Sequence, residues 1–328
     1  MPLLDVENLT IDIPTEAGLL HAVNGISFTL ERGETLAIVG ESGSGKSLTS
    51  LALMDLLPSR AVRRADTMRF DGIDLMAAGE REKENLRGDR MAMIFQEPMT
   101  SLNPAYTIGD QLAEALRRHR RVDRRAARER AVHLLERVGI TAAASRLGQY
   151  PHQLSGGLRQ RVMIAMALMC EPDLIVADEP TTALDVTIQA QILKLLRDLQ
   201  QEFGMALILV THDLGVVARV ATKVAVMYAG RFVEAGPVEA VFGAPSHPYT
   251  QGLLRSIPVP GRTRPGEPLG TIPGQVPNLV GTLTGCMFRN RCDHAAGRCA
   301  EEVPDRTILP GHRMACILEP TLAGGRPQ

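Results

Sequence analysis

Gly40-Glu-Ser-Gly-Ser-Gly-Lys-Ser47 follows the short apolar run Leu36–Val39 and precedes the apolar stretch Leu48–Leu57. The octapeptide fits the pattern G-x-x-x-x-G-K-S/T, which requires a strand before it and a helix after it. Its glycines let the backbone curl so that successive N–H groups and the start of the helix point at a phosphate. The stretch therefore predicts a nucleotide-phosphate loop in an α/β fold, with these residues at the nucleotide: Gly40, Ser42, Gly43, Ser44, Gly45, Lys46, Ser47 and Leu48.

Two side chains of this loop have distinct expected roles. Lys46 can reach the β- and γ-phosphate oxygens of ATP, and the Ser47 hydroxyl can ligate Mg²⁺. A glycine-rich turn without a ligand is the alternative, because the pattern arises by chance in about one chain in a hundred of this length. The flanking strand and helix favour the phosphate loop.

A second element is Leu174-Ile-Val-Ala-Asp-Glu179, which predicts a buried strand that delivers two adjacent carboxylates. Neighbouring strand residues point to opposite sides. We therefore expect Asp178 in the Mg²⁺ shell and Glu179 facing the water that attacks the γ-phosphate. A solvated acidic turn is the alternative for an isolated pair of this kind, and the phosphate loop favours the catalytic interpretation.

A third element is Leu154-Ser-Gly-Gly-Leu-Arg-Gln-Arg161, which leads into the apolar run VMIAMALM. Ser155, Gly156 and Gly157 form a second helix start suited to an anion, and the Ser155 hydroxyl and the glycine amides suit a γ-phosphate. The segment lacks a phosphate-binding lysine, and the first loop already binds the nucleotide. Two half-sites on one chain indicate a head-to-tail pair of chains.

The rest of the chain suggests one large domain and one small one, which 328 residues with 45% hydrophobic composition can support. Apolar runs at Ala206–Val210 and Val224–Tyr228 predict further strands of a parallel sheet. We expect a nucleotide-binding domain over residues 1–244 with a helical insert at about 98–165. A proline- and glycine-rich tract then leads into a small, loop-rich carboxy-terminal domain over residues 245–328.

Charge offers no general attraction for nucleic acid, because the formal net charge is −1. Eight arginines fall within Arg117–Arg130, but no aromatic residue is interleaved to stack bases, so we interpret the segment as a solvated helical face. No signal peptide or membrane-length apolar run is present in the sequence. We expect a protein without nucleic-acid partners that is cytosolic or held at a membrane by something else.

The motifs resemble those of ABC-type nucleotide-binding subunits over about Leu4–Glu239, and six motifs occur along the chain in the order found in that family. The phosphate loop and Asp178-Glu179 match the family's Walker A and B elements. LSGGLRQR resembles the LSGGQ signature, with Leu158 in place of glutamine. The resemblance implies a RecA-like core with a helical subdomain, and ATP sandwiched between Walker A and B of one subunit and the signature of the other.

Three short motifs add residues to the resemblance. Gln96 in FQEP corresponds to the Q-loop, Ala183-Leu-Asp185 to the D-loop and His212 in THD to the switch histidine. The family implies that Gln96 senses Mg²⁺ and water, that His212 orients Glu179 and the γ-phosphate, and that Asp185 links the two sites. The implied catalytic residues are Glu179, His212 and Gln96, and the implied Mg²⁺ residues are Ser47, Gln96 and Asp178. One departure is that no Phe, Tyr or Trp precedes Phe28 to stack on adenine, which leaves His21 as the nearest planar side chain.

The carboxy-terminal part narrows the resemblance. Pro245-Ser-His-Pro-Tyr-Thr-Gln-Gly-Leu-Leu254 and the cysteine-containing tail are similar to the oligopeptide/dipeptide import branch. That branch implies an ATPase subunit, peripheral on the cytoplasmic face of the bacterial inner membrane. Its implied partners are a second, identical or related ATPase subunit, two transmembrane permease subunits and a periplasmic substrate-binding protein. Nickel, glutathione and small peptides remain open as cargo.

Two other function classes compete with this one. A soluble ABC ATPase acting on nucleic acid or ribosomes would need a long coiled-coil insertion or tandem cassettes, and the sequence has neither. A redox or metal sensor would rest on the cysteines alone.

Four of the five cysteines, Cys286, Cys292, Cys299 and Cys316, fall in the spacing C-x5-C-x6-C-x16-C. Thiolate ligands suit zinc or an iron–sulfur cluster. Structural zinc sites usually contain close C-x2-4-C pairs, which are absent here. Partly because some members of the family carry such a cluster, we expect a [4Fe–4S] cluster, with zinc or free thiols as alternatives. Cys170 is excluded because it follows the signature in an apolar helix and is expected in the core.

Overall fold

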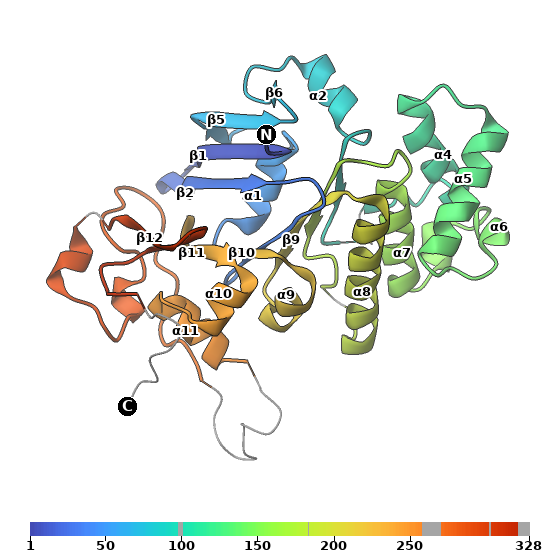
Figure 1. The fold of residues 1–328 in the computed structure, drawn as a ribbon. Coiled ribbons are helices and arrows are strands. Elements are labelled where there is room, and N and C mark those ends of the chain that lie inside the picture. The colour runs from blue at the N-terminus through green and yellow to red at the C-terminus, as the bar shows by residue number, and fades with distance from the viewer. Residues whose placement is uncertain (98–100, 183, 258–269, 302, 321–328) are drawn as a thin grey trace. The chain divides into compact units, whose positions relative to one another are not determined.

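The computed structural model describes residues 1–97, 101–182, 184–257, 270–301 and 303–320 (Figure 1). The chain divides into two compact units, each built from segments far apart in the sequence. The first contains Met1–Leu3, Leu30–Glu34 and Asp71–Val210, and the second contains Leu4–Thr29, Thr35–Phe70 and Thr211–Gln328. The predicted domain boundary at residue 244 stays a prediction.

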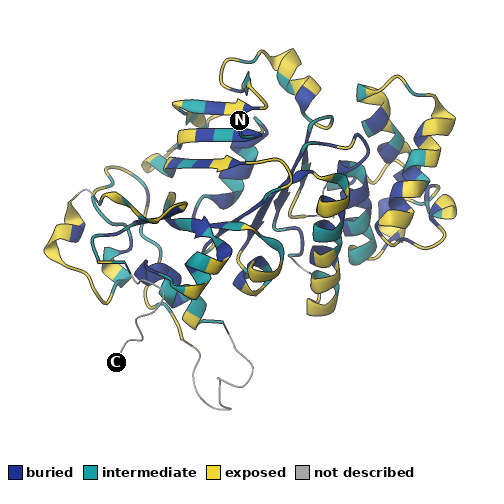
Figure 2. Ribbon diagram, viewed as in Figure 1, coloured by how far each residue is buried: buried dark blue, intermediate teal, exposed yellow. Residues whose placement is uncertain are grey.

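The first unit contains a parallel sheet of three strands, β7 (Met91–Ile94), β8 (Leu174–Asp178) and β9 (Ala206–Thr211). β8 pairs with both neighbours, with Ile94 opposite Ala177 and Asp178 opposite Val210. β8 and β9 are buried along their whole length, as their dark blue colour in Figure 2 shows. Continuous Ile, Leu and Val runs form such strands because a parallel sheet is covered on both faces.

Helices make up the rest of the first unit, together with the short strand β6 (Ile73–Asp74). α4, α5 and α7 pack against one another and lie side by side in shades of green in Figure 1. Thr107 caps α4 and Asp123 caps α5 by accepting backbone N–H groups. Among the described residues, the helices with known bounds are α2 (Glu80–Leu86), α4 (Ile108–His119), α5 (Arg124–Arg137), α6 (Ala143–Arg146), η1 (Pro151–Gln153), α7 (Gly156–Ala167) and α8 (Val186–Phe203).

The arginine-rich segment lies at the end of α4 and along α5, and most of its side chains are exposed. Arg118 pairs with Glu84, and Arg125 pairs with Glu129 one helical turn away. Buried positions of α5 are Ala and Leu on the opposite stripe. The segment is therefore the solvated helical face that the sequence predicts.

In the second unit, a sheet runs in the order β12-β13-β11-β10-β3. β3 (Thr35–Val39) and β10 (Lys223–Tyr228) are parallel, whereas β11 (Arg231–Pro237), β13 (His312–Ala315) and β12 (Asp305–Leu309) continue it antiparallel. Glu234 of β11 lies opposite Met314 of β13. The last strands of the chain thus extend the sheet whose β3 leads into the phosphate loop.

A second, antiparallel sheet of this unit contains β1 (Leu4–Thr15), β2 (Gly18–Leu30), β4 (Val62–Arg64) and β5 (Thr67–Phe70). The helices are α1 (Lys46–Leu53), α9 (Leu214–Val220), α10 (Val238–Gly243), α11 (Pro248–Arg255), η2 (Arg289–Arg291) and η3 (Gly297–Ala300). α1 starts two residues before the predicted Leu48 and ends four residues before the predicted Leu57. The early end has a local cause, because Asp55 has a positive φ of 54° and Pro58 disfavours helix at Leu57.

The core of the second unit includes three aromatic rings from distant parts of the chain. Tyr228 of β10, Tyr249 of α11 and Phe288 have ring centroids 4.6 to 5.3 Å apart. All three side chains are buried. None of the helices in the described part of the chain has the length and apolar character needed to cross a lipid bilayer.

Candidate nucleotide-binding site

The phosphate loop between β3 and α1 depends on its glycines for steric reasons. A Cβ atom on Gly40 would lie 2.0 Å from the Met227 carbonyl oxygen, and one on Gly45 would lie 2.5 Å from that of Ala22. Gly40, Gly43 and Gly45 have φ angles of 155°, 76° and 103°. L-residues with side chains rarely adopt such angles. The loop can therefore follow this path only with glycine at positions 40 and 45, and its backbone angle also favours glycine at position 43.

Lys46 is the first residue of α1 and is 5% exposed. Its ammonium group donates to the carbonyl oxygens of Gly40 and Glu41, each at 2.9 Å. These bonds hold the cation against the first turn of the loop. Ser47 and Leu48 follow in the first turn of α1, where backbone N–H groups of a helix are open to an anion.

Two predicted residues of the second unit lie outside the loop. His212 directly follows β9 and is exposed, and the next residue, Asp213, caps α9 by accepting from Gly215 N at 2.9 Å. His21, the predicted planar partner for adenine, lies in β2 with its Nδ1 2.7 Å from an Asp12 carboxylate oxygen. Adenine stacking by His21 stays a prediction.

In the first unit, the structure brings Gln96 and Glu179 together. Both residues follow the carboxyl ends of neighbouring parallel strands, β7 and β8, which meet at one edge of the sheet. The Gln96 side-chain amide donates to a Glu179 carboxylate oxygen at 3.3 Å. Thr182, which sequence reasoning missed, donates its hydroxyl to the same oxygen at 2.8 Å. In the sequence, the only signal for this role of Thr182 is its hydroxyl group. The contact itself depends on the turn after β8, which the sequence pattern does not specify.

Glu179 has an uncommon backbone conformation, with φ at 45°. Its N–H donates to the carbonyl of Val210 at 2.9 Å, so a bond to the neighbouring strand holds the turn. Asp178, the last residue of β8, is 5% exposed. Strained non-glycine residues of this kind gather at functional sites, and the strain here falls on the predicted catalytic carboxylate.

The signature segment is open at its start. Ser155 precedes α7 and is exposed, and its side chain makes no capping hydrogen bond to the helix. Gly156 is exposed too, and a Cβ atom on Gly157 would lie 3.2 Å from Ile188 of α8. The hydroxyl and the first amides of α7 therefore face solvent, where a second molecule can reach them.

The D-loop residue Asp185 serves as the N-cap of α8 and accepts from Ile188 N at 2.9 Å. Its neighbour Val186 is 83% exposed, an unusual state for a valine in the first turn of a helix. Ala183, the first residue of the predicted D-loop, lies outside the described residues.

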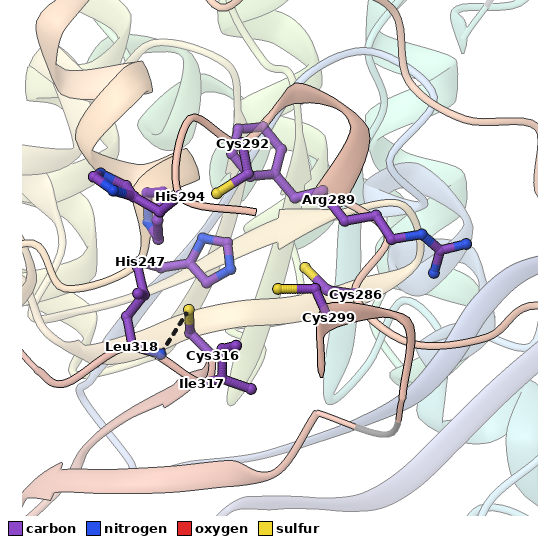
Figure 3. Close-up of a pocket in the computed structure, with 11 residues that line it drawn as sticks. His247, Cys286, Arg289, Cys292, His294, Cys299, Cys316, Ile317 and Leu318 are labelled. Carbon is purple, nitrogen blue, oxygen red and sulfur yellow. Dashed lines mark hydrogen bonds between the residues drawn. The ribbon is translucent and has the colours of Figure 1, made fainter. Parts of the chain in front are cut away.

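The four clustered cysteines, Cys286, Cys292, Cys299 and Cys316, line one small pocket with His247 and Phe288. Figure 3 shows their sulfur atoms turned toward a shared space. The pKa values of Cys286, Cys292 and Cys316 are raised, chiefly because burial disfavours the thiolate. Cys170, which belongs to the first unit, is buried, as predicted, with its thiol 3.7 Å from the Ala115 carbonyl.

Metal binding by this pocket was predicted from the spacing and the resemblance. Among the residues that the structure describes, no group of three or more His, Cys, Asp or Glu side chains is arranged to hold a metal ion. The expected iron–sulfur or zinc centre therefore gains no support from this arrangement. The predicted Mg²⁺ ligands Ser47, Gln96 and Asp178 stay a prediction.

Comparisons with known proteins cover nearly the whole chain. The profile of the ABC transporter family matches residues 23–182, and that of the oligopeptide/dipeptide transporter C-terminal region matches residues 233–299. The dipeptide transport ATP-binding protein DppD of Escherichia coli is 50% identical over 327 residues, covering 100% of this chain and 99% of that protein. DppD of Bacillus subtilis is 49% identical over 318 residues, covering 96% and 94%.

The chain belongs to the family of ABC transporter ATP-binding proteins. The dimeric post-hydrolysis structure of the ATP-binding cassette MJ0796 with ADP and phosphate has a TM-score of 0.64 at 27% identity, covering 72% of this chain and 98% of that one. For cbiO1 of Clostridium perfringens, part of an ABC transporter complex, the TM-score is 0.60 at 28% identity, covering 73% and 89%. The predicted ABC fold and the ATPase activity of the chain are confirmed.

Proposed function

We propose that this ABC ATPase hydrolyses ATP to drive the import of dipeptides or oligopeptides. The observation that carries this proposal is the likeness to dipeptide transport ATP-binding proteins along the full length of the chain, including its carboxy-terminal region. The protein would be peripheral on the cytoplasmic face of the inner membrane. It would work with a second ATPase subunit, two permease subunits and a periplasmic binding protein.

In the proposed reaction, Lys46 binds the β- and γ-phosphates and Glu179 polarises the attacking water. Ser47, Asp178 and Gln96 would hold Mg²⁺, which would supply positive charge to neutralise the phosphates. His212 orients Glu179 and the γ-phosphate. The exposed start of α7 at Ser155 supports a role toward the nucleotide of the second subunit, with Asp185 linking the two sites.

Uptake of a radiolabelled dipeptide by cells tests the cargo. Cells whose chromosomal copy carries Lys46→Ala should lose uptake, whereas Lys194→Ala, at an exposed lysine of α8, should leave it unchanged. If Lys46→Ala cells lose nickel or glutathione uptake but keep normal dipeptide uptake, the cargo is nickel or glutathione and not a peptide. Normal uptake of all three solutes would contradict an import function of this kind.

We also propose a [4Fe–4S] cluster, rather than zinc, at the four clustered cysteines. Four thiols in one pocket are the donor set of such clusters. Backbone N–H groups already bond to the sulfurs, as with Leu318 N to Cys316 and Ala296 N to Cys299, each at 3.5 Å. Zinc needs four sulfurs about 2.3 Å from one point, whereas a cluster holds its cysteines on several metal atoms.

His247 gives the pocket a further polar atom. Its Nδ1 accepts from Tyr249 N at 3.1 Å, so the neutral ring carries its proton on Nε2. Nε2 is buried and has no hydrogen-bond partner among the described residues, although the side chain lines the cysteine pocket (Figure 3). A buried donor without a partner is unfavourable, and a bound group with acceptor atoms would satisfy it.

Metal analysis of the full chain purified without oxygen tests the cluster. We expect brown protein with iron and acid-labile sulfide, lost in Cys299→Ser and kept in Cys170→Ser, the matched buried cysteine outside the pocket. Colourless protein with one equivalent of zinc, or with no metal, would contradict the cluster.

A further inference from the structure

The second residue of the phosphate loop, Glu41, is bound by two side chains from the carboxy-terminal region. Its backbone N–H donates to the Tyr249 hydroxyl at 3.0 Å. Its carboxylate accepts hydrogen bonds from both terminal nitrogens of the Arg291 guanidinium, at 2.7 and 3.1 Å. Such a paired arrangement is the strong and directional form of an ion pair.

Arg291 is itself fixed on every side. Its side chain is 5% exposed, and it donates to the carbonyl oxygens of Pro273 at 2.8 Å and Ile272 at 3.1 Å. The guanidinium also lies over the rings of Tyr228 and Phe288, 5.7 and 6.0 Å from their centroids. A buried arginine with these partners has little freedom to move, so it can hold Glu41 in one position.

Glu41 connects this contact to the proposed phosphate-binding lysine. The carbonyl oxygen of Glu41 accepts a hydrogen bond from the Lys46 ammonium at 2.9 Å. Tyr249 and Arg291 thus fix the N–H and the side chain of the residue whose carbonyl binds Lys46. The tyrosine ring packs against Tyr228 and Phe288, which keeps its hydroxyl in place.

We infer that Arg291 and Tyr249 are positioning residues for the ATP phosphate loop and act through Glu41. The carboxy-terminal region thereby sets the affinity of the loop for nucleotide. Because both residues act through Glu41, hydrolysis at saturating ATP should proceed at nearly the normal rate without them. The inference rests on the proposed role of Lys46.

The test compares the KM for ATP and kcat of purified full-length variants, together with ATP affinity by calorimetry. Arg291→Gln removes the paired contact and should raise KM and Kd about tenfold with kcat nearly unchanged. Tyr249→Phe removes a single oxygen, keeps the ring packing, and should raise both about threefold. Arg298→Gln, at an exposed arginine of the same region, should leave both constants unchanged.

A double-mutant cycle with Glu41→Gln identifies the path. If Arg291 acts through Glu41, the variant that combines Arg291→Gln with Glu41→Gln binds ATP no more weakly than whichever single variant binds it more weakly. Independent, multiplying losses would contradict the path. A fall in kcat with unchanged KM in both Arg291→Gln and Tyr249→Phe would show a merely structural role and overturn the inference. Lys46→Ala distinguishes a failure of this inference from a failure of the proposed nucleotide site. Normal ATP binding in that variant would refute the assignment of the phosphate loop itself.

Discussion

The side-chain amide of Gln96 donates a hydrogen bond to the carboxylate of Glu179 across 3.3 Å, although 83 positions separate the two residues. The parallel register of β7 and β8 brings them to the same edge of the sheet. The Gln96 amide therefore orients the carboxylate that is proposed to polarise the attacking water.

Replacing Gln96 with alanine should slow hydrolysis about tenfold while ATP binding stays within about twofold of wild type. The Glu179 carboxylate loses a side-chain donor, a contact worth about 1.5 kcal/mol when the acceptor is charged. Single-turnover hydrolysis and calorimetry measure the two effects. Gln201→Ala, at an exposed glutamine of α8, is the control, and equal rates in both variants would contradict the role of Gln96.

Replacing Lys46 with alanine should weaken ATP binding about 100-fold or more. The triphosphate loses its cationic partner within the loop, and each hydrogen bond to a charged group contributes about 1.5–3 kcal/mol. Calorimetric titration with Mg-ATP measures the loss. Lys194→Ala should bind as wild type does, because Lys194 forms only an exposed pair with Asp198 one turn away. Wild-type affinity in Lys46→Ala would refute the site.

Mixed dimers should show that Ser155 serves the partner's nucleotide. Ser155→Arg in one chain and Lys46→Ala in the other should leave one working site and about half the activity. Both changes in a single chain should abolish hydrolysis at both sites. The opposite pattern would mean that each chain completes its own site. Ser145→Arg, at another exposed serine of the first unit, should leave activity unchanged.

Asp71 should contribute stability that depends on pH. Hydrogen bonds from Arg90 and then Arg32 lower the pKa of Asp71. A carboxyl group with a lowered pKa in the folded state stabilises above its unfolded pKa of about 3.9, and this stability is lost as pH falls through the folded value. Asp71 has a φ of 48°, which asparagine tolerates well. Asp71→Asn should therefore cost about 0.5–1 kcal/mol at pH 7, a figure reduced for solvent exposure.

Urea unfolding at several pH values measures this difference. The gap between wild type and Asp71→Asn should be constant from pH 7 down to about pH 5 and shrink below about pH 4. A gap that stays the same at acidic pH would mean that the carboxylate charge has no part in it.

The sequence alone predicts the parts of the site that depend on local pattern. The glycines and Lys46 of the loop occur at fixed spacing, and the strands before Gly40 and at Asp178 are continuous apolar runs. The reason that the loop requires glycine is visible only in the structure, where the Met227 carbonyl leaves no room for a side chain at Gly40. The contact of Arg291 with Glu41 spans 250 positions. No spacing rule links residues so far apart, because the tertiary fold alone brings them together.

For the cysteine pocket too, the sequence predicts some features and not others. Their spacing and the family resemblance predict that they gather, and they do line one pocket. The polar atom of His247 in that pocket could not be predicted, since its orientation depends on the turn at the start of α11. The early end of α1 was missed because the apolar stretch continues past Leu53 while the backbone turns at Asp55.

Hydrolysis of bound ATP by Glu179→Gln tests the central claim most directly. An amide cannot act as the general base, and positioned general bases contribute about 100-fold or more to the rate. The variant should bind Mg-ATP as tightly as wild type, form dimers on size-exclusion chromatography with ATP trapped inside, and release phosphate at least about 100-fold more slowly. Phosphate release at the wild-type rate from Glu179→Gln would contradict the assignment of Glu179 as the catalytic carboxylate of this ABC ATPase.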